Sequence, residues 1–389
     1  MKTLSILLFT FPLLFACAQS ETNKTNDSIE SDTTANSNED SFDNNFKLEN
    51  YFSKNQKLET SVEIIFDRMS SHDKVAQLIM PAIGEHGQKE STIDKLVDEG
   101  KIGGLLLLNG TKEEFSNWVR KYNIVNDSLG KLPFFYSADA EPSLVNRKIK
   151  NSTPVAKANT LKNKNEVINV ANTISSDLKE IGINYNFAPV VDMSPNKTVG
   201  WRSFGHEPDS VIPWSISFIK ETQQSQIIAT AKHFPGHGFV EGDTHKKLVY
   251  IDGEMKELKN YPPLIENDVM SIMIAHIAIQ NNASYNTNNM PATTSKEVVT
   301  NLLRDSLNFD GLIVTDAMNM GGVSYIEDAD ILAISAGCDI LLMPLDASKA
   351  HAKLLSKYNS DDAFKVKVDS SVKRIVRAKL CLGLIQKIE

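Results

Sequence analysis

The chain has 389 residues, of which 41% are hydrophobic and 23% are charged, and its formal net charge is -8. This composition is typical of a globular protein with a sizeable core. The acidic balance excludes the basic footprint of a nucleic-acid-binding protein, so we expect no nucleic acid among its partners.

The N-terminus has the pattern of a secretory signal. An apolar run over residues 4–15 follows Lys2, and it is too short to span a bilayer, which needs about 20 apolar residues. The run ends in "LFAC" (14–17), which resembles a bacterial lipoprotein cleavage box. We therefore expect residues 1–16 to be removed and Cys17 to be lipidated, which makes this an exported lipoprotein of the outer membrane, on its periplasmic face or the cell surface. The alternative is an ordinary signal with an incidental cysteine.

Two further segments concern the organisation of the mature chain. Residues 17–50 are rich in Ser, Thr, Asn, Asp and Glu, so they bury too little apolar surface to order, and we expect a disordered tether. The folded domain should then comprise residues 51–389. Cys338 and Cys381 lie in apolar surroundings, where they could pair or remain buried thiols.

The folded part alternates eight short apolar runs with longer stretches of helical periodicity. The runs span residues 75–80, 103–108, 133–138, 185–191, 227–234, 271–276, 311–317 and 339–344. The stretch at 165–182 has apolar residues at helical spacing and ends in a glycine. Buried strands separated by helices predict a parallel sheet, and eight such units predict an α/β fold of the single (β/α)8 TIM-type barrel. The alternative, an open doubly wound sheet, would favour a G-x-G-x-x-G turn, and the sequence has none.

Polar side chains stand at the ends of five of the predicted strands. They are Asp139, Asp192, Lys232 with His233, His276 and Asp316. Any one of them could be a helix cap or a satisfied core residue. Catalytic groups of such barrels come from the C-terminal ends of the strands, so the set predicts a polar pocket at one end of the barrel.

Retaining glycoside hydrolysis is one chemistry that fits these groups. It needs a nucleophile and a proton donor that later acts as a base. Asp316 suits the nucleophile, and Glu141 is the nearest second carboxylate by position but has no other mark of the role. His245 is the other candidate, because an imidazole exchanges protons near neutral pH and Asp243, two residues earlier, could orient its ring.

Several motifs together carry a resemblance to a known family. They are "AKHFPGHG" followed by "DTH", and "FAPVVD", "WRSFG", "VTDAMNMGGV" and "AGCDILLMP". From about residue 60 to its end the chain resembles glycoside hydrolase family 3, in the β-N-acetylglucosaminidase branch. Pro142-Ser143 and Phe239-Val240 replace residues that are usual in that family, which affects loop shape more than the catalytic pair.

The resemblance implies a role for individual residues. Asp316 matches the nucleophile that forms a covalent glycosyl-enzyme, and His245 with Asp243 matches an acid/base dyad on a mobile loop. The residues matching the sugar-binding positions are Asp139, Arg147, Arg202, Lys232 and His233. The resemblance implies no cofactor and no metal.

The expected activity is that of an exo-β-N-acetylglucosaminidase, which removes terminal β-linked GlcNAc from oligosaccharides or peptidoglycan fragments. Because the acid/base is an imidazole, a phosphorylase is one alternative, and a sugar-binding lipoprotein without catalysis is another. A metal-dependent hydrolase could use His233, His237, Asp243 and His245, but the Pro-Gly turn after His233 breaks the helical face such a site uses. His237, between two glycines, is expected to shape the turn.

Overall fold

The computed structural model describes residues 45–193, 196 and 199–386. The predicted signal, Cys17 and most of the predicted tether lie outside these residues. Residues 45–50, which the sequence assigns to the tether, belong to the folded unit, because Leu48 in the 3-10 helix η1 (Leu48–Asn50) packs into the core and is only 3% exposed. No helix in the described part of the chain has the length and apolar character needed to cross a membrane.

Seven parallel strands form the central sheet, in the order β12-β10-β8-β7-β5-β3-β2. They are β2 (Ala82–Ile83), β3 (Gly104–Leu107), β5 (Phe135–Ala138), β7 (Tyr185–Asn186), β8 (Ile228–Phe234), β10 (Ser271–Ile274) and β12 (Leu312–Thr315). All of their side chains are buried, which explains why the sequence shows continuous apolar runs and no alternation. The predicted α/β class with a parallel sheet is confirmed, and the sheet is curled.

A separate pair, β1 (Ile79–Met80) and β13 (Leu341–Leu342), is also parallel. Only Pro81 separates β1 from β2, and the carbonyl groups of this stretch alternate between two neighbours. Leu78 and Met80 accept from Leu341 and Met343, whereas Ile79 and Pro81 accept from Gly103 and Leu106. A bridge between Val314 and Ile340 links β12 to the residue before β13. Each of the eight predicted runs contains one strand.

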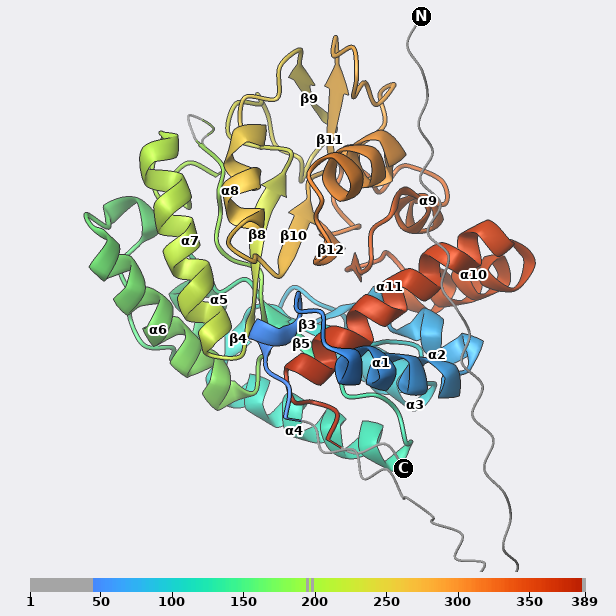
Figure 1. The fold of residues 1–389 in the computed structure, drawn as a ribbon. Coiled ribbons are helices and arrows are strands. Elements are labelled where there is room, and N and C mark those ends of the chain that lie inside the picture. The colour runs from blue at the N-terminus through green and yellow to red at the C-terminus, as the bar shows by residue number, and fades with distance from the viewer. Residues whose placement is uncertain (1–44, 194–195, 197–198, 387–389) are drawn as a thin grey trace, which may run out of the picture. The chain divides into compact units, whose positions relative to one another are not determined.

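Two short parallel pairs complete the described sheets. β4 (Gly110–Thr111) pairs with β6 (Ile149–Lys150), and β9 (Val249–Asp252) pairs with β11 (Ile277–Gln280). β9 and β11 lie at the top of Figure 1, beyond the C-terminal ends of β8 and β10.

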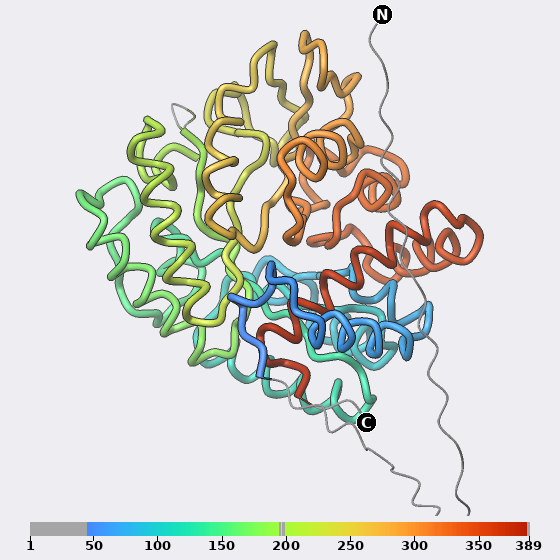
Figure 2. The backbone as a smooth tube through the Cα atoms, in the orientation of Figure 1, coloured from blue at the N-terminus to red at the C-terminus, as the bar shows by residue number. Residues whose placement is uncertain are grey.

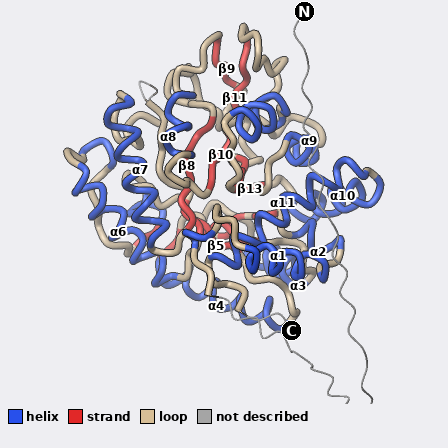
Figure 3. The backbone as a smooth tube through the Cα atoms, in the orientation of Figure 1, coloured by secondary structure: helices blue, strands red, loops and turns tan. Residues whose placement is uncertain are grey.

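The helices surround the strands, as Figure 3 shows. The α-helices are α1 (Gln56–Arg68), α2 (Ser71–Ala76), α3 (Glu90–Asp98), α4 (Lys112–Ser128), α5 (Val145–Lys148), α6 (Lys164–Ile181), α7 (Pro208–Gln224), α8 (Tyr261–Ile265), α9 (Ala329–Ala336), α10 (Ala347–Ser360) and α11 (Asp362–Cys381). The remaining helical segments are η2 (Ala158–Thr160), η3 (Leu258–Asn260), η4 (Ala292–Thr294) and the π-helix η5 (Glu297–Ser306). α1 packs against α11, so the first and last described helices lie side by side (Figure 2).

Helix α6 shows how local sequence sets an element. The Asn163 side chain accepts from the Glu166 N–H at its N-terminus. Gly182 ends it with a φ of 95°, a left-handed conformation that a residue without Cβ adopts at little cost. The helix predicted over 165–182 is therefore confirmed.

The two cysteines of the described chain, Cys338 and Cys381, are buried and not bonded to one another. Of the two alternatives left open by the sequence, the structure has the free thiols.

Lys379 in α11 is a fully buried lysine without a carboxylate partner among the described residues. Its Nζ donates to Gln77 Oε1 (2.6 Å) and to the Gly103 carbonyl (3.1 Å), and it lies 4.9 Å from the centre of the Phe135 ring. Burial lowers the pKa of Lys379 to about 7.

This lysine should make stability depend on pH. In the unfolded chain its pKa is about 10.4, so between pH 7 and 10 the unfolded state binds the extra proton and folding is disfavoured as the pH falls. Lys379→Met should remove this dependence. The free energy of unfolding of the variant minus that of the wild type should rise by up to about 1.4 kcal/mol per pH unit from pH 10 down to 7, and level off below.

Urea unfolding at several pH values measures the difference. Lys365→Met, on the exposed face of the same helix, is the matched control and should follow the wild-type curve. Parallel curves for the wild type and Lys379→Met would contradict the prediction.

Candidate active site

The C-terminal ends of the strands bring distant residues together. Asp139 directly follows β5, Lys232 lies near the C-terminal end of β8, and Asp316 directly follows β12. Lys232 Nζ donates to Asp139 Oδ1 over 2.9 Å. Burial raises the pKa of Asp139, but the charges of Lys232 and Lys148 outweigh it and lower the pKa, so this carboxylate is ionised.

Glu141 is the counter-ion at the centre of this group. Its carboxylate accepts two parallel hydrogen bonds from Arg202 (2.8 and 2.7 Å) and lies 2.6 Å from Lys232 Nζ. The side chain is 0% exposed, and although burial raises its pKa, Arg202 and Lys232 lower it to about 2. Such a group holds no proton near neutral pH, so Glu141 is a structural anion and the suggestion that it is the proton donor is wrong.

The two predicted sugar-binding arginines differ in their surroundings. Arg202 is held by Glu141 and its side chain is 12% exposed. Arg147, in α5, is exposed, and the contacts of the described chain include none between its side chain and Asp139. Its neighbour Lys148 instead lies 3.8 Å from Asp139. The role of Arg147 stays a prediction, and Lys148 is a residue that sequence reasoning missed.

A second buried carboxylate, Asp192, orients His233. Asp192 Oδ2 lies 2.7 Å from His233 Nδ1, and Oδ1 accepts the backbone N–H groups of His233 (3.2 Å) and His237 (2.8 Å). Because the carboxylate accepts a hydrogen bond from Nδ1, it fixes the orientation of the ring, and Nε2 does not contact Asp192. The sequence placed Asp192 at a strand end but gave it no role. That position was the sequence signal that could have identified it as a residue of the site.

Asp316 is a half-buried carboxylate directly after β12. Burial raises its pKa, but His233, the Ala317 N–H (2.8 Å from Oδ1) and Lys232 lower it on balance. An ionised carboxylate is the form that a nucleophile needs.

His276 lies behind this carboxylate and is fully buried. Its Nδ1 is 2.7 Å from Thr293 Oγ1 and its Nε2 is 3.0 Å from the Ala317 carbonyl. Burial lowers the pKa of His276, so the ring is neutral and donates from Nε2 to that carbonyl. His276 therefore supports the backbone beside Asp316.

Asp243 and His245 lie together in the loop between β8 and β9. Asp243 Oδ1 is 2.7 Å from His245 Nδ1 and accepts the His245 backbone N–H over 3.0 Å. The side chains are 33% and 61% exposed, so Nε2 of His245 is the open end of the pair. Burial raises the pKa of Asp243, but its hydrogen bonds with His245 lower it on balance.

The loop of the dyad packs on the segment that follows Asp316. Gly321 N–H donates to the His245 carbonyl (3.0 Å), and Gly322 N–H donates to the Thr244 carbonyl (2.9 Å). A Cβ at Gly321 would lie 2.4 Å from the Lys246 carbonyl, so only glycine permits this approach. The two glycines thus join the candidate nucleophile to the candidate acid/base.

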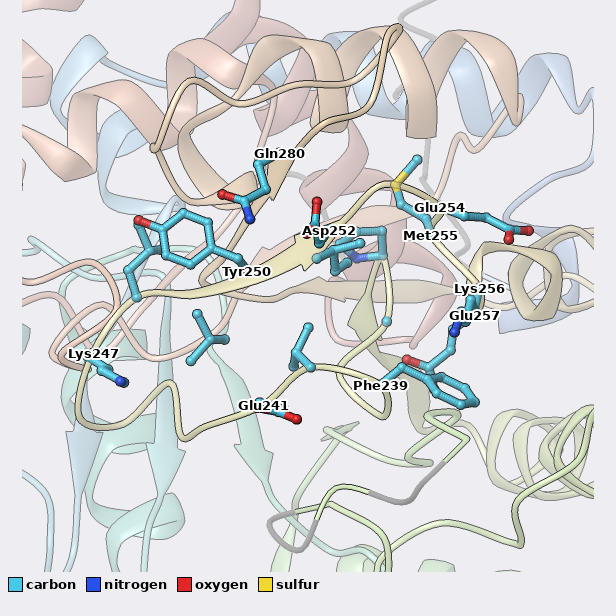
Figure 4. A pocket seen from close by; sticks show the side chains of 16 residues that line it. Phe239, Glu241, Lys247, Tyr250, Asp252, Glu254, Met255, Lys256, Glu257 and Gln280 are labelled. Carbon is cyan, nitrogen blue, oxygen red and sulfur yellow. The ribbon is translucent and has the colours of Figure 1, made fainter.

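A cavity of about 490 Å³ lies between the dyad loop and β9 (Figure 4). Its lining includes Glu241, Lys247 and Tyr250, and it includes none of the sugar-site residues. The loop therefore has open space on one side.

The metal alternative lacks a ligand set in the described residues, where no three His, Cys, Asp or Glu side chains are arranged to hold an ion. His233, His237 and His245 instead contact Asp192, Thr244 and Asp243, respectively.

Comparison with known families and curated proteins gives consistent matches. Residues 70–378 match the Glycosyl hydrolase family 3 N terminal domain. Beta-hexosaminidase A of Pseudoalteromonas piscicida is 28% identical over 326 residues, which cover 74% of this chain and 54% of that protein. Beta-hexosaminidase of Hydrogenovibrio crunogenus is 31% identical over 180 residues, covering 44% of this chain and 49% of that protein. The chain spans about half the length of these curated relatives.

Solved structures show the same likeness. A glycoside hydrolase family 3 beta-N-acetylglucosaminidase from Paenibacillus sp. str. FPU-7 is 26% identical with a TM-score of 0.75, covering 81% of this chain and 63% of that one. The Beta-N-acetylhexosaminidase from Beutenbergia cavernae is 24% identical with a TM-score of 0.72, covering 80% of this chain and 98% of that one, and it shows a shared fold.

The geometry of Glu141 gives a testable prediction. Glu141→Ala leaves Arg202 without its two hydrogen bonds and removes one of two carboxylates from Lys232. We expect a loss of about 3–5 kcal/mol in the free energy of unfolding, because a buried charge is left uncompensated. Urea unfolding measures it.

The matched control is Glu180→Ala, which removes an ion pair of Lys112 with a carboxylate that is 69% exposed. This change should cost no more than about 1 kcal/mol. Equal losses for the two variants would show that Glu141 is not the anion on which the site depends.

Proposed function

Because the chain belongs to glycosyl hydrolase family 3, we propose that it is a retaining exo-β-N-acetylglucosaminidase that removes terminal β-linked GlcNAc from oligosaccharides or peptidoglycan fragments. One observation carries the proposal: the ionised Asp316 and the His245–Asp243 pair lie on two loops joined by backbone hydrogen bonds. The beta-hexosaminidases among its relatives support the same substrate class.

In the first step, the Asp316 carboxylate attacks the anomeric carbon while His245 donates a proton to the glycosidic oxygen, which leaves with the aglycone. In the second step, His245 removes a proton from water, and the water oxygen displaces Asp316 from the anomeric carbon. Asp243 holds the ring through Nδ1 and stabilises the imidazolium, so Nε2 is the nitrogen that exchanges the proton.

The terminal sugar is proposed to be held by the polar groups at the strand ends. These are Asp139, Arg147, Arg202, Lys232 and His233. The ionised Asp139 offers hydroxyl acceptors, and the cations donate. Glu141 compensates the charges of Arg202 and Lys232, and Lys232 also pairs with Asp139, so the sugar hydroxyls meet groups that are fixed before binding.

Two further expectations from the sequence remain proposals. The first is closure of the strands into a (β/α)8 barrel, which the β1–β13 pair and the Val314–Ile340 bridge support. The second is export with lipidation at Cys17, which the "LFAC" sequence supports, and attachment to the outer membrane.

The activity can be tested with 4-nitrophenyl β-N-acetylglucosaminide and the corresponding β-glucoside. We expect purified protein to release nitrophenol from the acetylated sugar, and Asp316→Asn to lower the rate at least about 10³-fold, because no covalent intermediate can form. Circular dichroism of the variant controls for folding. Persisting turnover in Asp316→Asn would exclude it as the nucleophile.

The same assay with and without phosphate identifies the acceptor. A rate that rises with phosphate, with sugar phosphate as product, would indicate a phosphorylase. A folded wild-type protein that turns over neither substrate but binds GlcNAc would indicate a sugar-binding protein and contradict the proposal.

Anchoring can be tested in cells through Cys17. Cys17→Ala should abolish incorporation of radiolabelled palmitate and shift the protein from the membrane fraction to the soluble fraction, because the modified thiol is lost. Labelling that survives this substitution would exclude Cys17 as the lipid site.

A further inference from the structure

Thr244 is the buried residue of an exposed loop. It lies between Asp243 and His245, yet it is only 2% exposed, whereas the His245 side chain is 61% exposed. Thr244 Oγ1 lies 3.2 Å from His237 Nε2. The middle residue of the dyad segment is thus tied to the turn at the end of β8.

The turn that carries His237 is itself held by two buried carboxylates. Asp192 accepts the His237 backbone N–H over 2.8 Å, and Glu257 accepts the Gly238 N–H over 2.7 Å. A Cβ at Gly236 would lie 2.5 Å from Glu257 Cβ, and one at Gly238 would lie 2.4 Å from Glu257 Oε1. The two glycines of "PGHG" therefore make room for Glu257, which anchors the turn.

The His237 ring is arranged as a donor toward the loop. Its Nδ1 is buried and has no hydrogen-bond partner within the described chain, and burial lowers the pKa of His237. A buried N–H without an acceptor is costly, so the neutral tautomer carries its proton on Nε2. The Nε2–H then donates to Thr244 Oγ1.

We propose that His237 is a positioning residue, which holds the acid/base dyad in place through its hydrogen bond with Thr244. The inference rests on the proposed function. Elsewhere the loop is held by Asn196 Nδ2, which donates to the Val240 carbonyl (2.7 Å), and by the backbone bonds from Gly321 and Gly322. Asn196 Nδ2 also lies 3.4 Å from the Gly242 carbonyl, before the dyad, whereas the His237 bond reaches Thr244, between Asp243 and His245.

The loop needs such a contact because space is open beside it. The cavity of about 490 Å³ between the loop and β9 gives the chain room to shift. A displacement of about 1 Å of a catalytic group can cost about 10²-fold in rate. Loss of the Thr244 hydroxyl should therefore slow the proton transfers of His245. It should change neither the reactivity of the nucleophile nor the fold.

Thr244→Val removes the hydroxyl and keeps the shape of the side chain. We expect kcat for 4-nitrophenyl β-N-acetylglucosaminide to fall about 10- to 100-fold, because nitrophenolate leaves with little help from an acid whereas the attack of water on the glycosyl-enzyme needs the His245 base. Thr244→Ser should recover most of the loss. Thr222→Val is the matched control, because the Thr222 hydroxyl in α7 is buried and makes no hydrogen bond within the described chain. It should behave as the wild type.

Azide distinguishes a loss of activity caused by a displaced dyad from a loss caused by disruption of the whole active site. Azide needs no base, so its terminal nitrogen can attack the anomeric carbon of the glycosyl-enzyme; the C–N bond forms as the bond to Asp316 breaks, and a glycosyl azide leaves. Azide should therefore restore turnover in Thr244→Val and produce the β-azide, with little effect on the wild type.

Limited proteolysis measures how firmly the loop is held, independently of enzyme activity. Lys246 and Lys247 are exposed trypsin sites beside the dyad. Cleavage there should be faster in Thr244→Val and His237→Phe than in the wild type, and His237→Gln, whose amide can replace the Nε2 donor, should protect again.

The outcomes separate the two proposals. A wild type without glycosidase activity contradicts the proposed function, whereas the trypsin rates still decide whether His237 anchors the loop. With an active wild type, unchanged kinetics in Thr244→Val, a loss that azide does not restore, or unchanged cleavage would each overturn the role of His237.

Discussion

A single buried carboxylate, Glu141, holds the positive charges of Arg202 and Lys232 at the C-terminal end of the sheet. Two cations removed from water cost several kcal/mol each unless they are paired with good geometry, and Glu141 meets this condition with a two-bond contact to one and a short contact to the other. The three residues come from distant parts of the chain, so the interaction joins the loops after β5 and β7 to β8. The proposed cage of fixed donors and acceptors for sugar hydroxyls depends on it.

A second centre, made by Asp192 and Glu257, supports the proton-transfer side of the site. Both side chains accept backbone N–H groups of the turn after β8, and burial, together with the nearby charge of Asp192, raises the pKa of Glu257 to about 8. The turn is therefore rigid where it leaves the strand. The dyad loop begins from this turn and ends at β9. Thr244 connects it to His237, and the backbone N–H groups of Gly321 and Gly322 connect it to the segment that follows the candidate nucleophile.

Residues that depart from the usual family pattern make local contacts around the site in this chain. Ser143 Oγ donates to the Trp201 carbonyl (2.8 Å) and accepts from the Ala158 N–H (3.0 Å), so it braces the segment that presents Arg202. Phe239 is exposed beside the cavity of the dyad loop. These positions lie around the site and leave its charged groups unchanged. They therefore favour a difference from other family members in the substrates accepted over a difference in the reaction.

Periodicity and apolar content alone determined the eight strand positions, helix α6 and the parallel sheet, because each depends on local pattern and burial. The motifs likewise singled out Asp316, His245 and Asp243 as candidates, whose roles remain proposals. Tertiary structure decided the roles of Glu141, Asp192 and Glu257, since a carboxylate is a proton donor or a structural anion according to which cations and N–H groups surround it. It also placed Lys148 beside Asp139 and left Arg147 exposed, and it drew Leu48 into the core. These outcomes depend on contacts between residues far apart in the chain, which no local pattern records.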